Sequence, residues 1–246
     1  MKILLIRHGE PDYAIDSLTP KGWREANLLA DRLISLPPAE GYYCSPLGRA
    51  KDTAKPTIER LGKDLEILDW LREFRADIAD PETGNRRMPW DLKPCFWRED
   101  PILLDGNRWL EHPLMNSDTP TPAQVYKETC DGLDALLARH GYVKEGALYR
   151  CENNLEGTIV LFCHMALAMT IIGYLTNVSP FLLWHGFCMP PSSVTTLVTE
   201  ERTKGLVSFR CFQMGDTSHL ALGNEPPSRM AMFQEVFTGT DHTNAT

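Results

Sequence analysis

The 246-residue sequence lacks the features that mark several classes of protein. No apolar run approaches the ~20 residues that a membrane-spanning helix needs, and the run after Met1 is too short for a secretory signal peptide. The net charge of −8 disfavours nucleic acid and anionic membranes as partners. The seven cysteines are scattered without a Cys-x-x-Cys pair, which argues against a disulfide framework and a zinc knuckle. These absences favour a cytoplasmic protein with reduced thiols.

Strand-like apolar segments alternate with helix-like segments along the chain. Residues 2–6 form a short apolar run typical of a buried strand, and Thr19-Pro20 is a good start for a helix that Pro37 ends. The other expected strands lie at residues 41–45, 65–71, 142–163 (a hairpin and a strand), 193–201 and 206–215, and the other helices at 46–62, 121–141 and 165–178. Pro56 is expected to kink or interrupt its helix. This alternation predicts an α/β fold, a three-layer αβα sandwich with a mainly parallel central sheet.

The pattern predicts one domain over residues 1–246, with an inserted cap segment at about 76–120. This segment holds many prolines and three of the six tryptophans, and it shows no sustained period. A loop of that length in a compact domain usually has a function or forms a small cap. A second insertion, a hairpin, is expected at about residues 142–157.

Charged and polar residues stand at the ends of several apolar segments. Arg7 and His8 end the first strand, and His164 ends the strand at residues 158–163. Arg49 lies in the first turn of a helix, and Glu73 follows the third strand. In doubly wound sheets the functional residues lie beyond the carboxyl ends of the strands. We therefore expect these five residues to share one site.

This set of residue types suits the chemistry of a phosphoryl group. Two guanidiniums can neutralise its oxygens through paired hydrogen bonds, and the helix amino termini at Arg49 and His164 add backbone N–H donors. A neutral imidazole can attack phosphorus and carry the phosphoryl group covalently. A carboxylic acid can protonate the leaving alkoxide and later accept a proton from water. The arginines supply positive charge, so no metal or other cofactor is expected.

Four stretches also carry a family resemblance. "LIRHGE", "CSPLGRAKDTA", "LREF" and "FCH" follow one another in an order that resembles the histidine phosphatase superfamily, which is similar to the cofactor-dependent phosphoglycerate mutases. The resemblance extends from Lys2 to about Leu220. It implies that His8 is the nucleophile and that Glu73 is the proton donor. It also implies that Arg7, Arg49 and His164 bind the phosphoryl group.

The sequence departs from the family pattern after the second histidine. Members usually have Gly or Asp there, whereas this chain has Met165. The absence of Asp removes the donor of the acid-phosphatase branch and favours Glu73, and the stretch that binds bisphosphoglycerate in mutases is not recognisable. We therefore predict a metal-independent phosphatase that hydrolyses a small phosphomonoester through a phosphohistidine on His8. A mutase-type phosphoryl transfer and a non-catalytic protein that binds a phosphorylated ligand are the alternatives.

Further residues are candidates for substrate binding, and the oligomeric state is left open. Glu10 and Tyr13 follow the nucleophile closely and could rim the pocket. Arg86, Trp90 and Trp97 could line it from the cap, although an apolar cluster that pins the long loop explains the tryptophans equally well. A zinc site made of His8, Glu10, Asp12 and His164 is a weaker alternative, because its spacing is unusual and the arginines would repel the ion.

Overall fold

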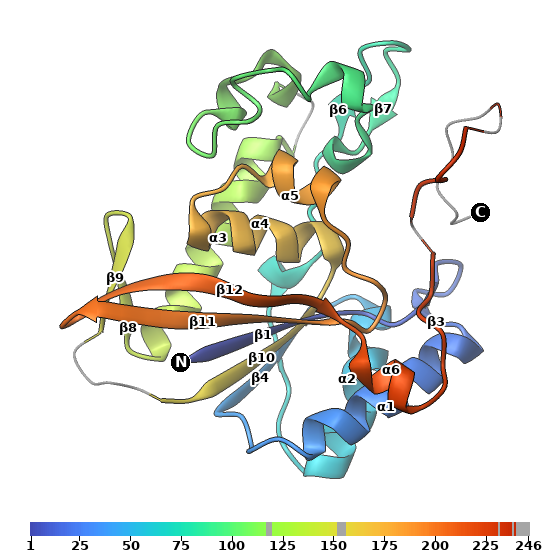
Figure 1. The fold of residues 1–246 in the computed structure, drawn as a ribbon, viewed down its shortest axis with the longest axis vertical. Coiled ribbons are helices and arrows are strands. Elements are labelled where there is room, and N and C mark those ends of the chain that lie inside the picture. The colour runs from blue at the N-terminus through green and yellow to red at the C-terminus, as the bar shows by residue number, and fades with distance from the viewer. Residues whose placement is uncertain (117–119, 152–155, 231, 238, 240–246) are drawn as a thin grey trace.

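The computed structural model describes residues 1–116, 120–151, 156–230, 232–237 and 239, which build an eight-stranded sheet with helices on both faces (Figure 1). The strand order is β5 (Glu66–Ile67), β4 (Gly41–Cys44), β10 (Thr158–Cys163), β1 (Lys2–Arg7), β11 (Val194–Thr203), β12 (Leu206–Asp216), β9 (Leu148–Cys151) and β8 (Tyr142–Glu145). The first four strands are parallel, and the other four extend the sheet in antiparallel fashion. The predicted α/β fold with a parallel sheet at its core is confirmed.

The two central strands are buried on both faces, which explains why they are apolar throughout. In β1, Ile3 and Leu5 belong to the apolar core on one face, while Leu4 and Ile6 belong to the core on the other. The neighbouring parallel strand β10 alternates in the same way. Successive side chains of a strand point to opposite faces, so a strand between two helical layers needs apolar residues at every position.

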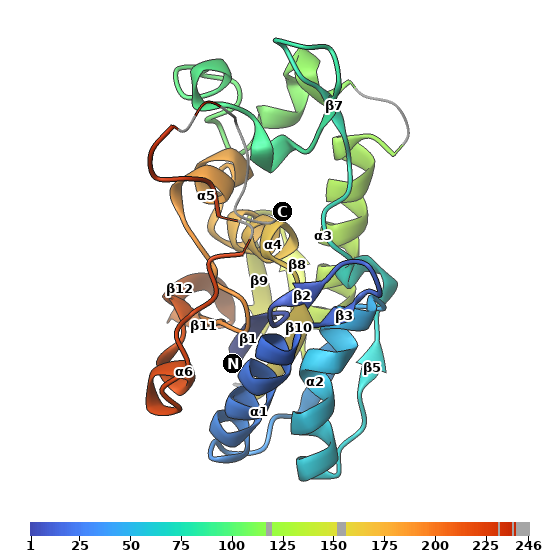
Figure 2. The same ribbon diagram turned by 90° about the vertical axis from the view of Figure 1, so that its right-hand side faces the viewer.

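Each face of the sheet is covered by its own helices. α3 (Pro122–Arg139), α4 (Met165–Thr176) and α5 (Pro180–Gly186) lie on one side; α1 (Pro20–Ile34) and α2 (Gly48–Leu61) pack together on the other, with α6 (Ser218–Leu222) against α1 (Figures 1 and 2). The Thr19 side chain caps α1 by accepting a hydrogen bond from the Gly22 N–H. No helix in the described ranges is long and apolar enough to cross a membrane.

Local structure differs from expectation in two places. α2 is continuous through Pro56, so the helix is not interrupted there; the proline lacks the N–H of one backbone hydrogen bond, and it is buried inside the protein. The strand expected at residues 65–71 is confined to Glu66–Ile67, and Asp69–Leu71 form a 3₁₀ turn. This early end to an edge strand turns the chain toward Glu73.

The expected cap segment contains little regular structure. Over residues 76–116 it has a two-stranded ribbon, β6 (Ile78–Ala79) and β7 (Arg86–Arg87), and short 3₁₀ turns, with no α-helix; residues 117–119 lie outside the described part. Most of its buried side chains, including Leu92 and Trp109, belong to the same apolar core as α4 and α5. The cap is therefore tied down by apolar packing.

The expected hairpin at residues 142–157 is part of the main sheet. β8 and β9 pair with each other, and β9 pairs with β12. Residues 152–155 lie outside the part of the chain that the structure describes.

Two neighbouring parallel strands connect to opposite faces of the sheet. β1 leads to α1 on one face, and β10 leads to α4 on the other (Figures 1 and 2). Such a switch in direction opens a crevice beyond the carboxyl ends of the strands. Arg7, His8 and His164 lie at this switch point.

Candidate active site

His8 follows β1 directly and is almost fully buried, with 3% of its surface exposed. Its Nδ1 lies 2.8 Å from the carbonyl oxygen of Gly9. A carbonyl oxygen can only accept, so Nδ1 carries the proton and Nε2 keeps its lone pair. Burial, together with the charges of Arg7 and Arg49, holds the pKa of His8 well below 6.5. His8 is therefore a neutral imidazole whose free nitrogen is Nε2.

The loop that carries His8 is fixed by backbone hydrogen bonds. The N–H of Gly9 donates to Thr53 Oγ1 at 2.9 Å, and the N–H of Glu10 donates to Glu25 Oε2 at 2.7 Å. Helix α1 approaches this loop so closely that a Cβ on Gly22 would lie 2.2 Å from the carbonyl oxygen of Glu10. Only glycine fits at that position, and this close approach holds the loop rigid.

Two buried arginines flank the imidazole. Arg7 donates from Nη1 to the carbonyl oxygen of Met189 at 2.5 Å, and Arg49 donates from Nη1 to Asp16 at 2.6 Å. The Nε atom of each arginine is buried and has no hydrogen-bond partner in the described part of the chain. Buried donors without partners are rare in folded proteins, and a ligand is one explanation. Both guanidiniums thus retain donors for an anion.

His164 contributes a second neutral imidazole from the end of β10. It is fully buried, and its ring centroid lies 5.1 Å from that of His8. Nε2 contacts the hydroxyl oxygen of Ser45 at 2.8 Å, whereas Nδ1 has no partner among the described residues. Burial, with smaller effects of the neighbouring His8, Arg49 and Arg7, holds the pKa of His164 well below 6.5.

Glu73 lies at the amino terminus of α4. Its Oε1 accepts hydrogen bonds from the N–H groups of Phe74 and Leu167, each at 2.9 Å. These bonds fix the carboxyl group beside the cavity that Glu73 lines. Burial raises the pKa of Glu73 above 4.5, although both hydrogen bonds and the arginines oppose the shift. A raised pKa favours the protonated form, which a general acid needs.

A cavity of about 710 Å³ opens above these groups. Arg7, His8, Arg49 and Glu73 line its inner part, and Tyr13 and Trp90 are among the residues around them. His164 is not among the lining residues, but its ring contacts that of His8, which lines the cavity. The structure thus brings together the five residues that the sequence placed at the ends of strands or at the start of a helix.

Four predicted substrate-binding residues are not among those that line this cavity: His164, which contacts His8, and Glu10, Arg86 and Trp97. Glu10 instead accepts hydrogen bonds from Thr19 and Ser228, which turn its carboxylate toward the carboxy-terminal segment. Arg86 is exposed and lies 3.8 Å from the carboxylate of Asp77. Trp97 is buried and stacks on His185 with ring centroids 4.5 Å apart, so it pins the cap.

Other residues of the site escaped the sequence analysis. Ser45 contacts His164, Asp16 pairs with Arg49, and Thr53 holds the N–H of Gly9. Ser45 and Thr53 lie within the motif "CSPLGRAKDTA", so the motif could have indicated that they belong to the site. Their hydrogen-bond partners depend on strand and helix packing, which the motif does not reveal. Met232 and Phe233 also line the cavity, and nothing in the sequence pattern indicated this.

The alternative zinc site is not assembled. Glu10 is engaged by Thr19 and Ser228, and the described residues contain no group of three or more His, Cys, Asp or Glu side chains that could hold a metal ion. All seven cysteines are free.

Comparisons with known proteins show what parts of the chain are similar to. A sequence model of the histidine phosphatase superfamily (branch 1) matches residues 3–91, which include Arg7, His8, Arg49 and Glu73. The predicted resemblance to this superfamily is confirmed. A search of curated protein sequences found no match.

Solved structures with the same fold include several phosphatases. A mutant phosphoserine phosphatase from Entamoeba histolytica, solved with phosphoserine, is 21% identical with a TM-score of 0.59, covering 89% of this chain and 98% of that chain. The mycobacterial glucosyl-3-phosphoglycerate phosphatase is 18% identical with a TM-score of 0.59, covering 88% and 99%. The α-ribazole phosphatase from Shigella flexneri is 16% identical with a TM-score of 0.54, covering 88% and 96%. At these identities the likeness shows the fold.

The buried Glu25 beneath the His8 loop generates a prediction about stability. Burial raises the pKa of Glu25 from 4.5 to about 7. The folded state therefore holds the carboxyl proton of Glu25 more tightly than the unfolded state does. The stabilisation of the folded state by this proton is complete below about pH 4.5 and is lost as pH rises through about 7. Glu25→Gln keeps the acceptor for the Glu10 N–H without the charge. Its free energy of unfolding, relative to the unsubstituted protein, should rise by about 3 kcal/mol between pH 5 and pH 8.

Urea unfolding of both proteins at a series of pH values measures this difference. Other titrating groups affect both proteins equally, so subtraction isolates Glu25. Stability curves that stay parallel over the whole range would contradict a raised pKa at this position.

Proposed function

We propose that this protein is a metal-independent phosphatase that hydrolyses a small phosphomonoester through a phosphohistidine on His8. One observation carries the proposal: His8 is held neutral, with its Nε2 lone pair free, beside two arginines that retain unpartnered donors. A neutral nucleophile among fixed positive charges suits attack on an anionic phosphoryl group. The phosphatases that share the fold support the same class of reaction.

In the first step, Arg7, Arg49 and His164 bind the phosphoryl oxygens and His8 attacks phosphorus. The Nε2 lone pair forms the N–P bond while the bond from phosphorus to the ester oxygen breaks. The electron pair of that bond leaves with the alkoxide, which takes the proton of Glu73. Phosphorylated His8 becomes cationic, and its Nδ1–H bond to the Gly9 carbonyl oxygen stabilises the charge.

In the second step, the Glu73 carboxylate accepts a proton from water. The resulting hydroxide attacks phosphorus, the N–P bond breaks, and its electron pair returns to Nε2. Inorganic phosphate leaves, and both His8 and Glu73 are restored. The arginines hold the phosphoryl oxygens throughout, so this scheme uses no metal ion.

The covalent intermediate can be trapped. Incubation with phosphorus-labelled substrate followed by rapid quenching should give a base-stable, acid-labile adduct on His8, and an excess of chelator should leave its formation unchanged. His8→Ala removes the nucleophile and should abolish both the adduct and turnover. His112→Ala, which changes a histidine paired with Asp100 outside the cavity, is the matched control and should retain both.

Peptide mapping after the quench identifies the modified residue. An adduct on a residue other than His8 would overturn the mechanism. Binding of phosphorylated compounds without adduct or turnover would instead support the non-catalytic binding protein.

The role of Glu73 can be tested with two leaving groups. Glu73→Gln should slow hydrolysis of an alkyl phosphate by ~10²–10⁴-fold, since the poor alkoxide leaving group needs its proton. Hydrolysis of p-nitrophenyl phosphate should slow much less, because its phenolate leaves with little help. Glu66→Gln, which changes an exposed glutamate outside the cavity, should behave like the unsubstituted protein on both esters. Equal rates of Glu73→Gln and the unsubstituted protein on both substrates would assign the proton to another group.

A further inference from the structure

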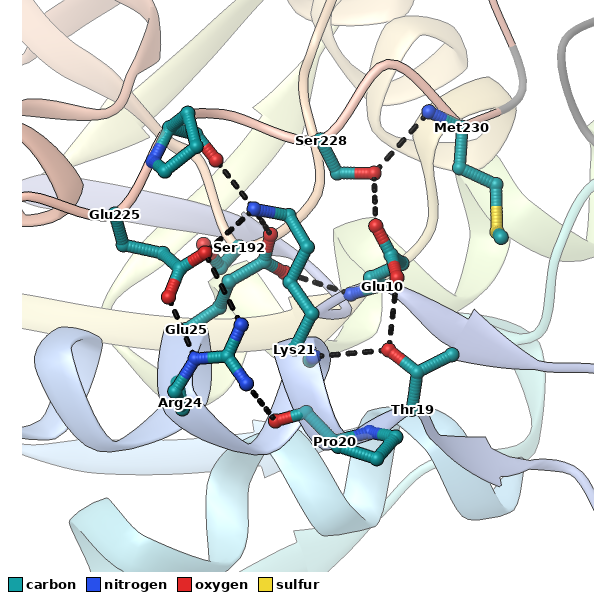
Figure 3. A network of polar contacts seen from close by, with 12 residues as sticks. Glu10, Thr19, Pro20, Lys21, Arg24, Glu25, Ser192, Glu225, Ser228 and Met230 are labelled. Carbon is teal, nitrogen blue, oxygen red and sulfur yellow. Dashed lines mark hydrogen bonds and ion pairs between the residues drawn. The ribbon is translucent and has the colours of Figure 1, made fainter.

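The segment after α6 is fastened to the start of α1 by a polar network (Figure 3). Lys21 Nζ donates to Glu225 Oε1 at 2.7 Å and to the carbonyl oxygen of Pro226 at 2.5 Å. Arg24 Nε donates to the other carboxylate oxygen of Glu225 at 2.7 Å. Hydrogen bonds from Arg24 and Lys21 lower the pKa of Glu225 to about 2, so its charge persists at neutral pH.

The same segment is then tied to the loop that carries the nucleophile. The Ser228 hydroxyl donates to Glu10 Oε2 at 2.6 Å, and it accepts from the Met230 N–H at 3.1 Å (Figure 3). Glu10 stands two residues after His8. These contacts hold the segment after α6 beside the loop that carries His8. Further along this segment, Met232 and Phe233 line the cavity.

Several aromatic side chains that line the cavity are exposed to solvent. Tyr13, Phe187 and Phe233 all line it, with 54%, 54% and 42% of their surfaces exposed. They are three of the five exposed Tyr and Phe residues in the described part of the chain. Exposed apolar side chains that cluster at one cavity mark a binding site for an apolar group.

The size of the cavity also favours a substrate with a sizeable organic group. At about 710 Å³ it is far larger than a phosphoryl group, and it lies within the range of ~300–1,000 Å³ typical of sites for larger organic ligands. Arg7, Arg49 and Glu73 account for part of its charged lining, which also includes Arg75, Asp91 and Lys93. The exposed aromatic side chains of the lining are left for the rest of the substrate.

We infer that the substrate is a phosphomonoester whose alcohol carries an apolar, ring-bearing group, and that Phe233 selects for this group. This inference rests on the proposed phosphatase function. The network around Glu225 and Ser228 holds Phe233 at the cavity, which the cap residue Trp90 also lines. An aromatic ring bound there is removed from water by the protein's own rings.

Two esters with primary alkoxide leaving groups test the inference. The value of kcat/KM should be higher for 2-phenylethyl phosphate than for 2-hydroxyethyl phosphate. Phe233→Ala should reduce this preference by about tenfold, the size expected when an apolar contact is lost from a pocket. Phe233→Leu should restore part of it. Phe237→Ala, an exposed residue of the same segment that does not line the cavity, is the matched control and should leave the preference unchanged.

Two outcomes overturn the inference while hydrolysis itself persists. One is an unsubstituted protein that hydrolyses both esters with no preference for the phenyl group. The other is a preference that Phe233→Ala leaves intact or that Phe237→Ala lowers equally. Thermal unfolding of each variant checks that the fold is retained.

A binding measurement separates this inference from the proposed function. Calorimetry compares 2-phenylethylphosphonate with methylphosphonate, neither of which needs to react. Tighter binding of the phenyl compound that depends on Phe233, without hydrolysis of any ester, would uphold the apolar subsite and refute the phosphatase. Hydrolysis of both esters with equal binding of the two phosphonates would uphold the phosphatase and refute the subsite.

Discussion

The hydrogen bond from His8 Nδ1 to the Gly9 carbonyl oxygen decides what this site can do. It fixes the tautomer, and it leaves Nε2 as the free nitrogen of a ring that burial and two arginines keep neutral. Without the bond, the buried ring could take the other tautomer, and Nε2 would be blocked by a proton. The rest of the site is built to hold this short loop in place.

The support for that loop comes from one helical layer and from the sheet. Helices α1 and α2 fix it through Glu25 and Thr53, while β10 provides the Cys163 carbonyl oxygen that accepts the His8 N–H. The parallel pairing of β1 with β10 brings His164 beside His8, although the two are far apart in sequence. Rigid strands thus position both imidazoles, and side chains from loops and helix ends add the charges around them.

The sequence was most informative where an apolar strand ends in a residue that resists burial. That pattern identified Arg7, His8 and His164, while Arg49 was indicated by its place in the first turn of a helix and Glu73 by its place after the third strand. The structure brings all five together. Regular periodicity likewise predicted the main helices and the parallel core.

Features that depend on tertiary packing could not be predicted. The edge strand at Glu66–Ile67 ends early because its pairing with β4 ends, which no local pattern revealed. Trp97 and Trp90 lie in the same aperiodic stretch, yet one pins the cap and the other lines the cavity. The segment that carries Phe233 is tied to α1 by ion pairs between residues distant in sequence, so composition alone gave no indication of its place.

The protonation state of His8 is the central claim, and nitrogen NMR of isotope-labelled histidine measures it directly. A pH titration of the free protein, with His8→Ala used to assign the resonances, reports both the tautomer and the pKa. The structure predicts that His8 stays neutral with its proton on Nδ1 well below pH 6.5. A ring that titrates near pH 6.5, or that carries its proton on Nε2, would contradict the account.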